Sequence, residues 1–240
     1  MSAPGPKRYL TIPRFDRIPW LVHGFGLRDW ALRDFQTVEA WKNFKVVWLD
    51  QVHRNTIRLI DKIPRRRLRG DALVTRLPEV FLIIKTADCL PIFLIDESKR
   101  VVAGVHCGWR STEKRMAQCA VRAMEENYGC RPADLLAGLG PSIGAACYEV
   151  GEEVVRAFEC AGHPPDCFRP HPRSRGKYFL DLALANRRQL EAEGVRPKNI
   201  ISLDVCTHCD SRLLSYRRDS DKKARLLNFI GVKATHCAPA

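Results

Sequence analysis

Residues 82–111 read LIIKTADCLPIFLIDESKRVVAGVHCGWRS, and they contain two apolar runs that each lead into residues able to bind a metal. The first run, residues 81–85, is short and rich in aromatic and β-branched side chains, which predicts a buried strand. It leads to Cys89, and Pro91 prevents a helix from simply continuing there. A thiol is therefore expected close to the end of a buried strand.

The second apolar run, residues 101–105, leads directly into His106 and Cys107. Because side chains alternate between the two faces of a strand, these neighbours should point in opposite directions. Gly108 follows them, and a glycine lets another backbone or a ligand come close. We therefore expect His106 to face a site and Cys107 to face the core.

A third apolar run, residues 46–49, precedes Gln51 and His53. His53 is thus a further imidazole expected just beyond a strand end. The residues alone leave two interpretations of His53, Cys89 and His106: three metal ligands, or a core thiol with two satisfied surface histidines, and by themselves they favour the second.

Six motifs spread over most of the chain resemble those of the laccase-domain family. They occur in this order: QVH (51–53), TADCLP (86–91), VHCGWR (105–110), GPSIGAACYEVG (140–151), FLDLALANRRQLEAEGV (179–195) and SYRRD (215–219). This family is also known as multicopper polyphenol oxidases and, more recently, as purine nucleoside phosphorylases. One short motif would be weak evidence, but six in register are strong.

The resemblance implies that His53, Cys89 and His106 together bind one zinc ion, and that all three act in catalysis. It also implies an α+β fold with mixed β-sheet layers flanked by helices. The chain departs from the family pattern at Arg54 and Ser111, where glycine is usual, and in a short N-terminal segment. There, the usual arginine and paired glycines are replaced by residues 23–26, HGFG.

At 240 residues the chain is predicted to form a single domain, residues 1–240, with residues 1–20 as an extended lead-in. Its hydrophobic content of 45% and charged content of 28% are ordinary for a globular enzyme. No apolar run is long enough to span a membrane, and no signal peptide is evident. We expect a cytoplasmic protein whose cysteines are reduced, most of them serving as small buried side chains, namely Cys119, Cys130, Cys147, Cys160 and Cys167.

The net charge of +13 raises the question of nucleic-acid binding. The densest basic run, residues 64–70, lies in a predicted turn and has no aromatic residues between its arginines, so a solvated loop is the favoured interpretation. Positive potential would still attract phosphate or nucleotides. The sequence does not determine the oligomeric state.

Secondary-structure elements alternate irregularly, which favours an α+β arrangement over a regular doubly wound one. The predicted helices cover residues 29–42, 111–127, 149–161 and 180–193, and a proline-rich loop is predicted over 164–177. Residues 46–60 are predicted to form two strands around Gln51-Val52-His53, and residues 135–139, 200–205, 212–216 and 226–230 are also predicted to be extended.

Four further residues are candidates for binding substrate. Arg110 and Arg217 could bind phosphate, because a guanidinium grips it in a fork, and Arg218 is a weaker candidate. The helix predicted to begin at Ser111 or Thr112 would add free N–H groups for the same anion.

The other two candidates, Gln51 and Asp88, each have two interpretations. Gln51 could contact a purine edge or close a turn. Asp88 could orient a ligand imidazole from behind or cap the turn before Cys89.

The segment Cys206-Thr207-His208-Cys209 has the C-x-x-C spacing of zinc and redox sites. His236 and Cys237 are two more ligand-type residues near the end of the chain. A second closely spaced ligand pair is missing, so packing is favoured over a second, structural zinc.

The leading functional hypothesis is a zinc-dependent purine nucleoside enzyme: phosphorolysis of adenosine, inosine or methylthioadenosine, with deamination of adenosine at the same site. One alternative is a copper-dependent polyphenol oxidase, because a cysteine and two histidines resemble a blue-copper set. A multicopper cluster, however, needs more than the seven histidines here, and no His-x-His pair exists. Another alternative is a cysteine-type hydrolase editing peptidoglycan precursors. A nucleic-acid-binding module would leave the three strand-end ligands unexplained.

Overall fold

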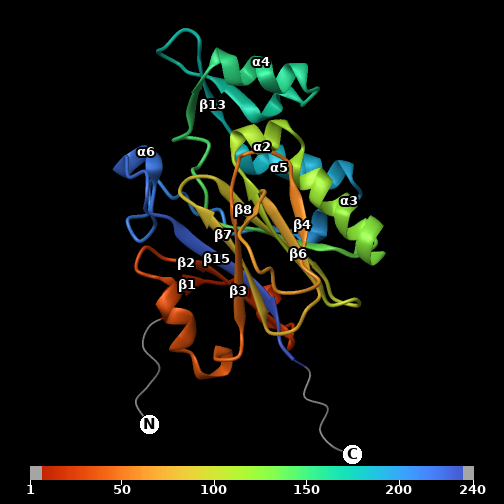
Figure 1. Cartoon of the computed structure of the whole chain (residues 1–240). Coiled ribbons are helices and arrows are strands. Elements are labelled where there is room, and N and C mark those ends of the chain that lie inside the picture. Colours follow the sequence, from red (N-terminus) through yellow and green to blue (C-terminus); the bar gives the residue numbers. More distant parts are fainter. Residues whose placement is uncertain (1–6, 235–240) are drawn as a thin grey trace, which may run out of the picture.

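Two mixed six-stranded β-sheets form the centre of the computed structural model, which describes residues 7–234 (Figure 1). In spatial order the first sheet contains β1 (Tyr9–Leu10), β2 (Leu21–Gly26), β15 (Leu226–Val232), β7 (Val80–Thr86), β3 (Lys45–Asp50) and β5 (Leu68–Arg69). The second contains β14 (Ile200–Ser202), β10 (Leu136–Leu139), β8 (Leu90–Asp96), β9 (Val101–Cys107), β6 (Ala72–Thr75) and β4 (Ile57–Leu59). The predicted single-domain α+β fold is confirmed.

The two sheets pack face to face, and alternate residues of their strands fill the space between them. Leu82 and Ile230 from the first sheet share one apolar cluster with Ile95 and Val102 from the second. The rings of Phe25 and Phe93 also stack across this space, with their centroids 4.6 Å apart. Burial on both faces explains why these strands are continuous apolar runs rather than alternating polar and apolar.

The outer face of the second sheet is covered by helices (Figure 1). These helices are α2 (Trp109–Glu113), α3 (Met116–Tyr128), α4 (Glu152–Cys160) and α5 (Leu182–Ala192). The chain also contains α1 (Pro13–Asp16), whose Phe15 packs in the cluster between the two sheets, and α6 (Tyr216–Asp219). Met116 and Ala120 of α3 and Leu190 of α5 pack on this face, where Cys107 is also fully buried. Cys107 therefore faces the core, as the strand alternation predicted.

An aromatic cluster covers the outer face of the first sheet, including Trp30, Phe35, Trp41 and Phe229. The helix predicted over residues 29–42 is wrong, because two short 3₁₀ turns, η1 (Leu32–Gln36) and η2 (Glu39–Trp41), are found there. The interruption lets three large rings from one short segment reach the same face of the sheet.

Other predicted boundaries also need correction. The expected loop over 164–177 contains η4 (Pro165–Cys167) and β12 (Phe168–Pro170), and β12 pairs with β13 (Lys177–Leu180) in a three-stranded sheet with β11 (Glu149–Gly151). The helix predicted from residue 149 therefore begins only at α4. The expected strand over 212–216 is a loop that leads into α6.

The remaining short turns are η3 (Pro132–Asp134) and η5 (Pro197–Asn199). The segment before β2 is not uniformly extended, because it contains α1 as well as β1. Within residues 7–234, no helix has the length and apolar character needed to cross a bilayer.

The helix predicted over residues 111–127 is two helices. The chain enters α2 at Trp109, with Gly108 as the N-cap, and turns at Arg115, whose φ of 58° ends α2 before α3 begins. Gly129 ends α3 in the left-handed conformation, which favours glycine. Val121 and Met124 of α3 are buried in the core, whereas Cys119 and Ala123 are only partly buried.

Candidate metal and substrate site

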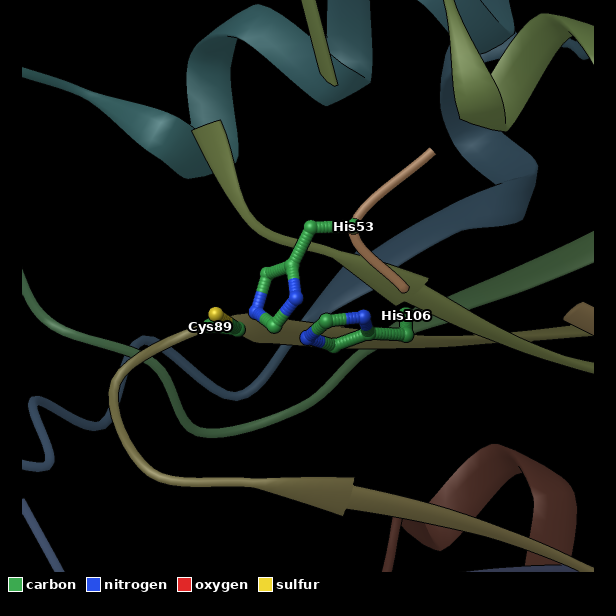
Figure 2. A group of neighbouring side chains, drawn as sticks. All are labelled: His53, Cys89 and His106. Atoms are coloured by element: carbon green, nitrogen blue, oxygen red, sulfur yellow. The ribbon is translucent and has the colours of Figure 1, made fainter. Parts of the chain in front are cut away.

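The side chains of His53, Cys89 and His106 converge at one end of the sheets (Figure 2). One ligand atom from each residue lies within 4.8 Å of the other two. The imidazole rings of His53 and His106 meet edge to face, with centroids 4.8 Å apart. Residues separated by up to 53 positions in sequence are thus brought within reach of a single ion.

Strand pairing explains why Cys89 and His106 are adjacent. β8 and β9 run antiparallel, and Leu90 lies opposite Cys107 and Pro91 opposite His106. Cys89, one residue before β8, therefore lies beside the end of β9.

His53 reaches the same point from the turn after β3, where its φ of 55° is uncommon for a residue other than glycine. Gly108 leaves the necessary space: a Cβ atom there would lie 2.9 Å from Cys89 Sγ and 3.4 Å from His53 Cδ2. Both features indicate that the local backbone is shaped to bring these side chains together.

A fully buried carboxylate, Asp71, contacts both His106 and the turn that carries His53, on the side away from the cavity. Its Oδ1 lies 2.9 Å from Nδ1 of His106 and accepts the main-chain N–H of His53 at 2.8 Å. The other oxygen, Oδ2, accepts the N–H of Arg54 at 2.8 Å. One carboxylate thus fixes the ring of His106 and the turn that carries His53, which leaves Nε2 of His106 available to a ligand.

The sequence did not predict this role for Asp71, and Asp88 had two interpretations: orienting a ligand imidazole or capping the turn before Cys89. Asp88 instead accepts the hydroxyl of Thr207 at 2.6 Å and the main-chain N–H of Arg217 at 2.7 Å, so it ties the turn before Cys89 to α6. The available signal for Asp71 was an acidic residue placed directly before a fully buried strand, β6.

The three side chains also influence one another electrostatically. Burial alone would raise the pKa of the Cys89 thiol, but the nearby imidazoles of His106 and His53 lower it to about 6. Burial would likewise lower the pKa of His106, but the Cys89 thiolate and Asp71 raise it to about 9. The arrangement therefore favours a thiolate, which is the form of cysteine that binds metals.

This donor set fits zinc. Two imidazoles and a thiolate are typical zinc ligands, and a catalytic zinc keeps a fourth position open. A carboxylate behind a ligand histidine, the position of Asp71 here, is also a common feature of such sites.

A cavity of about 640 Å³ opens over the three residues. All seven residues predicted for the site line it, and it is also bordered by Leu49, Asp50, Lys85, Thr86, Ala87, Gly108, Trp109, Tyr148, Tyr216 and Arg225. Its size suits a small organic ligand, for which pockets of roughly 300–1,000 Å³ are usual. Arg54, which departs from the family pattern, is not among the lining residues.

Cationic side chains surround this cavity. Arg110 is exposed, and its guanidinium lies 4.3 Å from the ring centroid of Trp109. Arg217 lies over Tyr148 at 5.5 Å and donates to the main-chain oxygen of Glu149 at 2.9 Å. Both arginines therefore border the same space as the candidate metal ligands.

Two expectations about anion binding need correction. The helix after His106 begins at Trp109 rather than at Ser111 or Thr112 and has only five residues, and the N–H of its N-cap, Gly108, is bonded to Ser111 Oγ at 3.1 Å. Arg218 is also engaged, because it donates to the main-chain oxygens of Thr207 and Leu213 at 2.9 and 2.6 Å.

Of its two predicted roles, contacting a purine edge or closing a turn, Gln51 has the structural one in its contacts with Lys85. Its side-chain oxygen accepts the N–H of Lys85, and its side-chain nitrogen donates to the Lys85 oxygen, both at 2.8 Å. The amide thus extends the pairing of β3 with β7 beyond the last main-chain pair. It positions the turn that carries His53.

Comparison with known proteins agrees with this geometry. Residues 32–233 match the family described as multi-copper polyphenol oxidoreductase laccase. The chain belongs to this family.

Several relatives of the chain carry names that refer to nucleosides. A purine nucleoside phosphorylase of Clostridium acetobutylicum is 33% identical over 202 residues, covering 82% of this chain and 81% of the relative. Adenosine deaminase RL5, from an unknown prokaryotic organism, is 41% identical over 140 residues, covering 58% and 53%. The crystal structure of YlmD from Geobacillus stearothermophilus has a TM-score of 0.82 at 27% identity, covering 95% of this chain and 100% of that one.

Proposed function

We propose that this protein is a zinc-dependent purine nucleoside enzyme that cleaves adenosine, inosine or methylthioadenosine with phosphate and also deaminates adenosine. The observation that supports this most is a single cavity with three zinc-type ligands at its base and two arginines on its border. The names of the relatives agree with nucleoside chemistry.

In phosphorolysis, a phosphate oxygen forms a bond to C1′ of the ribose while the bond from C1′ to N9 of the base breaks. The free base takes up a proton, and ribose 1-phosphate is released. Arg110 and Arg217 are the residues proposed to bind phosphate beside C1′, because guanidinium groups bind phosphate in a fork. Lys85 and Arg225, which also line the cavity, add positive potential.

Tyr148 is placed to contact the nucleoside. Its ring lies under Arg217 and lines the cavity. Burial raises the pKa of its phenol well above the ordinary value, so the hydroxyl remains a hydrogen-bond donor at physiological pH. The aromatic face offers a surface on which a purine can stack.

Deamination of adenosine exchanges the amino group at C6 for oxygen from water and releases ammonia. His53, Cys89 and His106 would hold the zinc for this step, with Asp71 fixing His106. When bound in this way, zinc supplies a Lewis acid and lowers the pKa of a coordinated water. The free thiols on which the site depends suit a reducing cytoplasm.

Copper-dependent phenol oxidation is the second candidate function, because the family description names copper. Among the described histidines, three are engaged elsewhere: His23 accepts the N–H of Ile12, His171 accepts that of Arg173, and His163 lies 2.9 Å from the Glu113 oxygen. Few imidazoles thus remain for a multicopper cluster within residues 7–234. A third candidate function is a cysteine-type hydrolase that acts on peptidoglycan precursors. The lowered pKa of Cys89 is consistent with it, because a thiolate can act as a nucleophile.

The phosphate-binding role of the arginines leads to a specific prediction. In Arg110→Gln and in Arg217→Gln, the KM for phosphate in inosine cleavage should rise by about tenfold or more, because a hydrogen bond to a charged group contributes about 1.5–3 kcal/mol. Deamination of adenosine, which consumes water instead, should change much less. Steady-state kinetics with varied phosphate measure both effects.

Arg131→Gln is a suitable control, since Arg131 is exposed and pairs with Asp134 away from the cavity. Its KM for phosphate should match that of the wild type. Unchanged KM values in both cavity variants would exclude these arginines from phosphate binding.

A further inference from the structure

A second group of ligand-type side chains lies outside the cavity. One ligand atom each of Cys147, His208 and Cys209 lies within 4.8 Å of the other two, and the sulfurs of Cys147 and Cys209 are 3.4 Å apart. The sulfur of Cys206 lies near these two thiols but is not one of the ligand atoms that all lie within 4.8 Å of one another. None of these four side chains is fully buried, and Cys209 is exposed, so apolar packing does not explain the cluster.

Two loops from different parts of the chain build this group. Cys147 belongs to the segment between β10 and β11, and the other three residues follow β14. The loops are joined by main-chain hydrogen bonds: the N–H of Ser142 donates to Val205 at 3.2 Å, and the N–H of Thr207 donates to Ser142 at 2.9 Å. The sequence signal was only C-x-x-C, since Cys147 is 59 residues from Cys206.

The sulfur of Cys206 accepts a main-chain hydrogen bond from the other loop. The N–H of Gly144 donates to this sulfur at 3.1 Å. A Cβ at Gly144 would lie 3.2 Å from the same sulfur, so glycine permits this close approach. N–H donors of this kind stabilise a thiolate, the form of cysteine that binds metals.

We propose that Cys147, Cys206, His208 and Cys209 bind a second zinc ion in a closed, structural site. Three thiolates and one imidazole form one of the standard tetrahedral sets for structural zinc. A disulfide between Cys147 and Cys209 would use only two of the sulfurs and would leave the imidazole and the N–H donor to Cys206 unexplained. The four ligands lie on described residues, whereas His236 and Cys237 lie outside the described part of the chain.

The second ion would stabilise the side of the cavity that contains Tyr148 and the turn before Cys89. Tyr148, which lines the cavity, directly follows Cys147, and Thr207 donates to Asp88 beside Cys89. Arg218 further anchors the second loop by donating to the main-chain oxygens of Thr207 and His208 at 2.9 and 3.0 Å. Loss of the ion should therefore make these two loops more mobile, although every residue proposed for catalysis remains present.

Zinc content tests this proposal independently of any catalytic activity. Protein purified under reducing conditions and passed over a weak chelator should contain about two zinc ions per chain. The Cys206→Ser/Cys209→Ser double variant should contain about one and should unfold at a lower temperature, because structural zinc contributes folding free energy. Cys160→Ser is the matched control, since Cys160 is an exposed thiol on α4 that belongs to neither ligand group, and it should keep both ions.

Cobalt provides a readout that does not depend on how well the double variant folds. In Cys89→Ser, where the first site lacks its thiolate, added cobalt(II) should still give the intense absorption of tetrahedral cobalt with several thiolate ligands. Wild-type protein with a single zinc that persists in the double variant would overturn the proposal. So would a Cys147–Cys209 disulfide found by peptide mapping together with no thiolate-bound cobalt after reduction.

Discussion

Replacing Cys89 by serine is expected to abolish nucleoside phosphorolysis and adenosine deamination together, each by more than about 100-fold. Loss of a residue behind a metal ligand typically reduces metal affinity or activity by 10–100-fold, and loss of a ligand itself should reduce it further. Cys89 supplies the only thiolate of the first metal group, beside His53 and His106. Turnover and zinc content should therefore fall in the same variant.

The comparison protein is again Cys160→Ser, which should keep both activities because its side chain is exposed and lies outside the cavity. Circular dichroism should show that Cys89→Ser is folded, since the partly exposed thiol contributes little to the core. A folded Cys89→Ser protein that kept one of the two activities at full rate would separate the reactions and contradict the shared site.

Replacing Asp71 by asparagine is expected to reduce zinc affinity by about 10–100-fold and stability by about 3 kcal/mol. Both oxygens of Asp71 accept main-chain N–H groups, so an amide nitrogen in place of one oxygen would face a donor. The asparagine side chain also lacks the negative charge that, in the wild type, keeps a proton on Nδ1 of His106. Competition with a zinc indicator and thermal unfolding would measure the two effects.

Asp96→Asn separates a metal effect from a general loss of stability. Asp96 is also buried and accepts the N–H of Lys99 and the hydroxyl of Ser98, but it lies at the other end of β8 from Cys89. It should lose stability while keeping normal zinc affinity. Equal zinc affinity in Asp71→Asn and the wild type would show that Asp71 does not prepare His106 for the metal.

The position of the site could be predicted because each candidate ligand follows a short apolar run. Strands of a sheet that end at one edge bring their following residues together, so His53, Cys89 and His106 could be selected without any contact information. The same alternation placed Cys107 in the core. Local patterns are sufficient for features that depend only on strand periodicity.

The features that were missed depend on contacts between distant residues. Asp88 is separated by 119 positions from Thr207, whose hydroxyl it accepts, so local sequence could not decide which carboxylate lies behind His106. The break between α2 and α3 occurs at Arg115, which adopts a left-handed conformation. This conformation is usually marked in a sequence by glycine, so an arginine gave no signal for the break. Arg115 is held there by hydrogen bonds to Gln118 and to the main-chain oxygen of Ala161, 46 residues away.

The most direct test of the central claim is the reaction of zinc-loaded protein with inosine at increasing phosphate concentration. We expect cleavage that rises with phosphate and yields ribose 1-phosphate and hypoxanthine in equal amounts, while conversion of adenosine to inosine proceeds without phosphate. Copper should be required for neither reaction. Absence of both reactions in zinc-loaded protein, together with phenol oxidation by copper-loaded protein, would contradict the account and favour the oxidase.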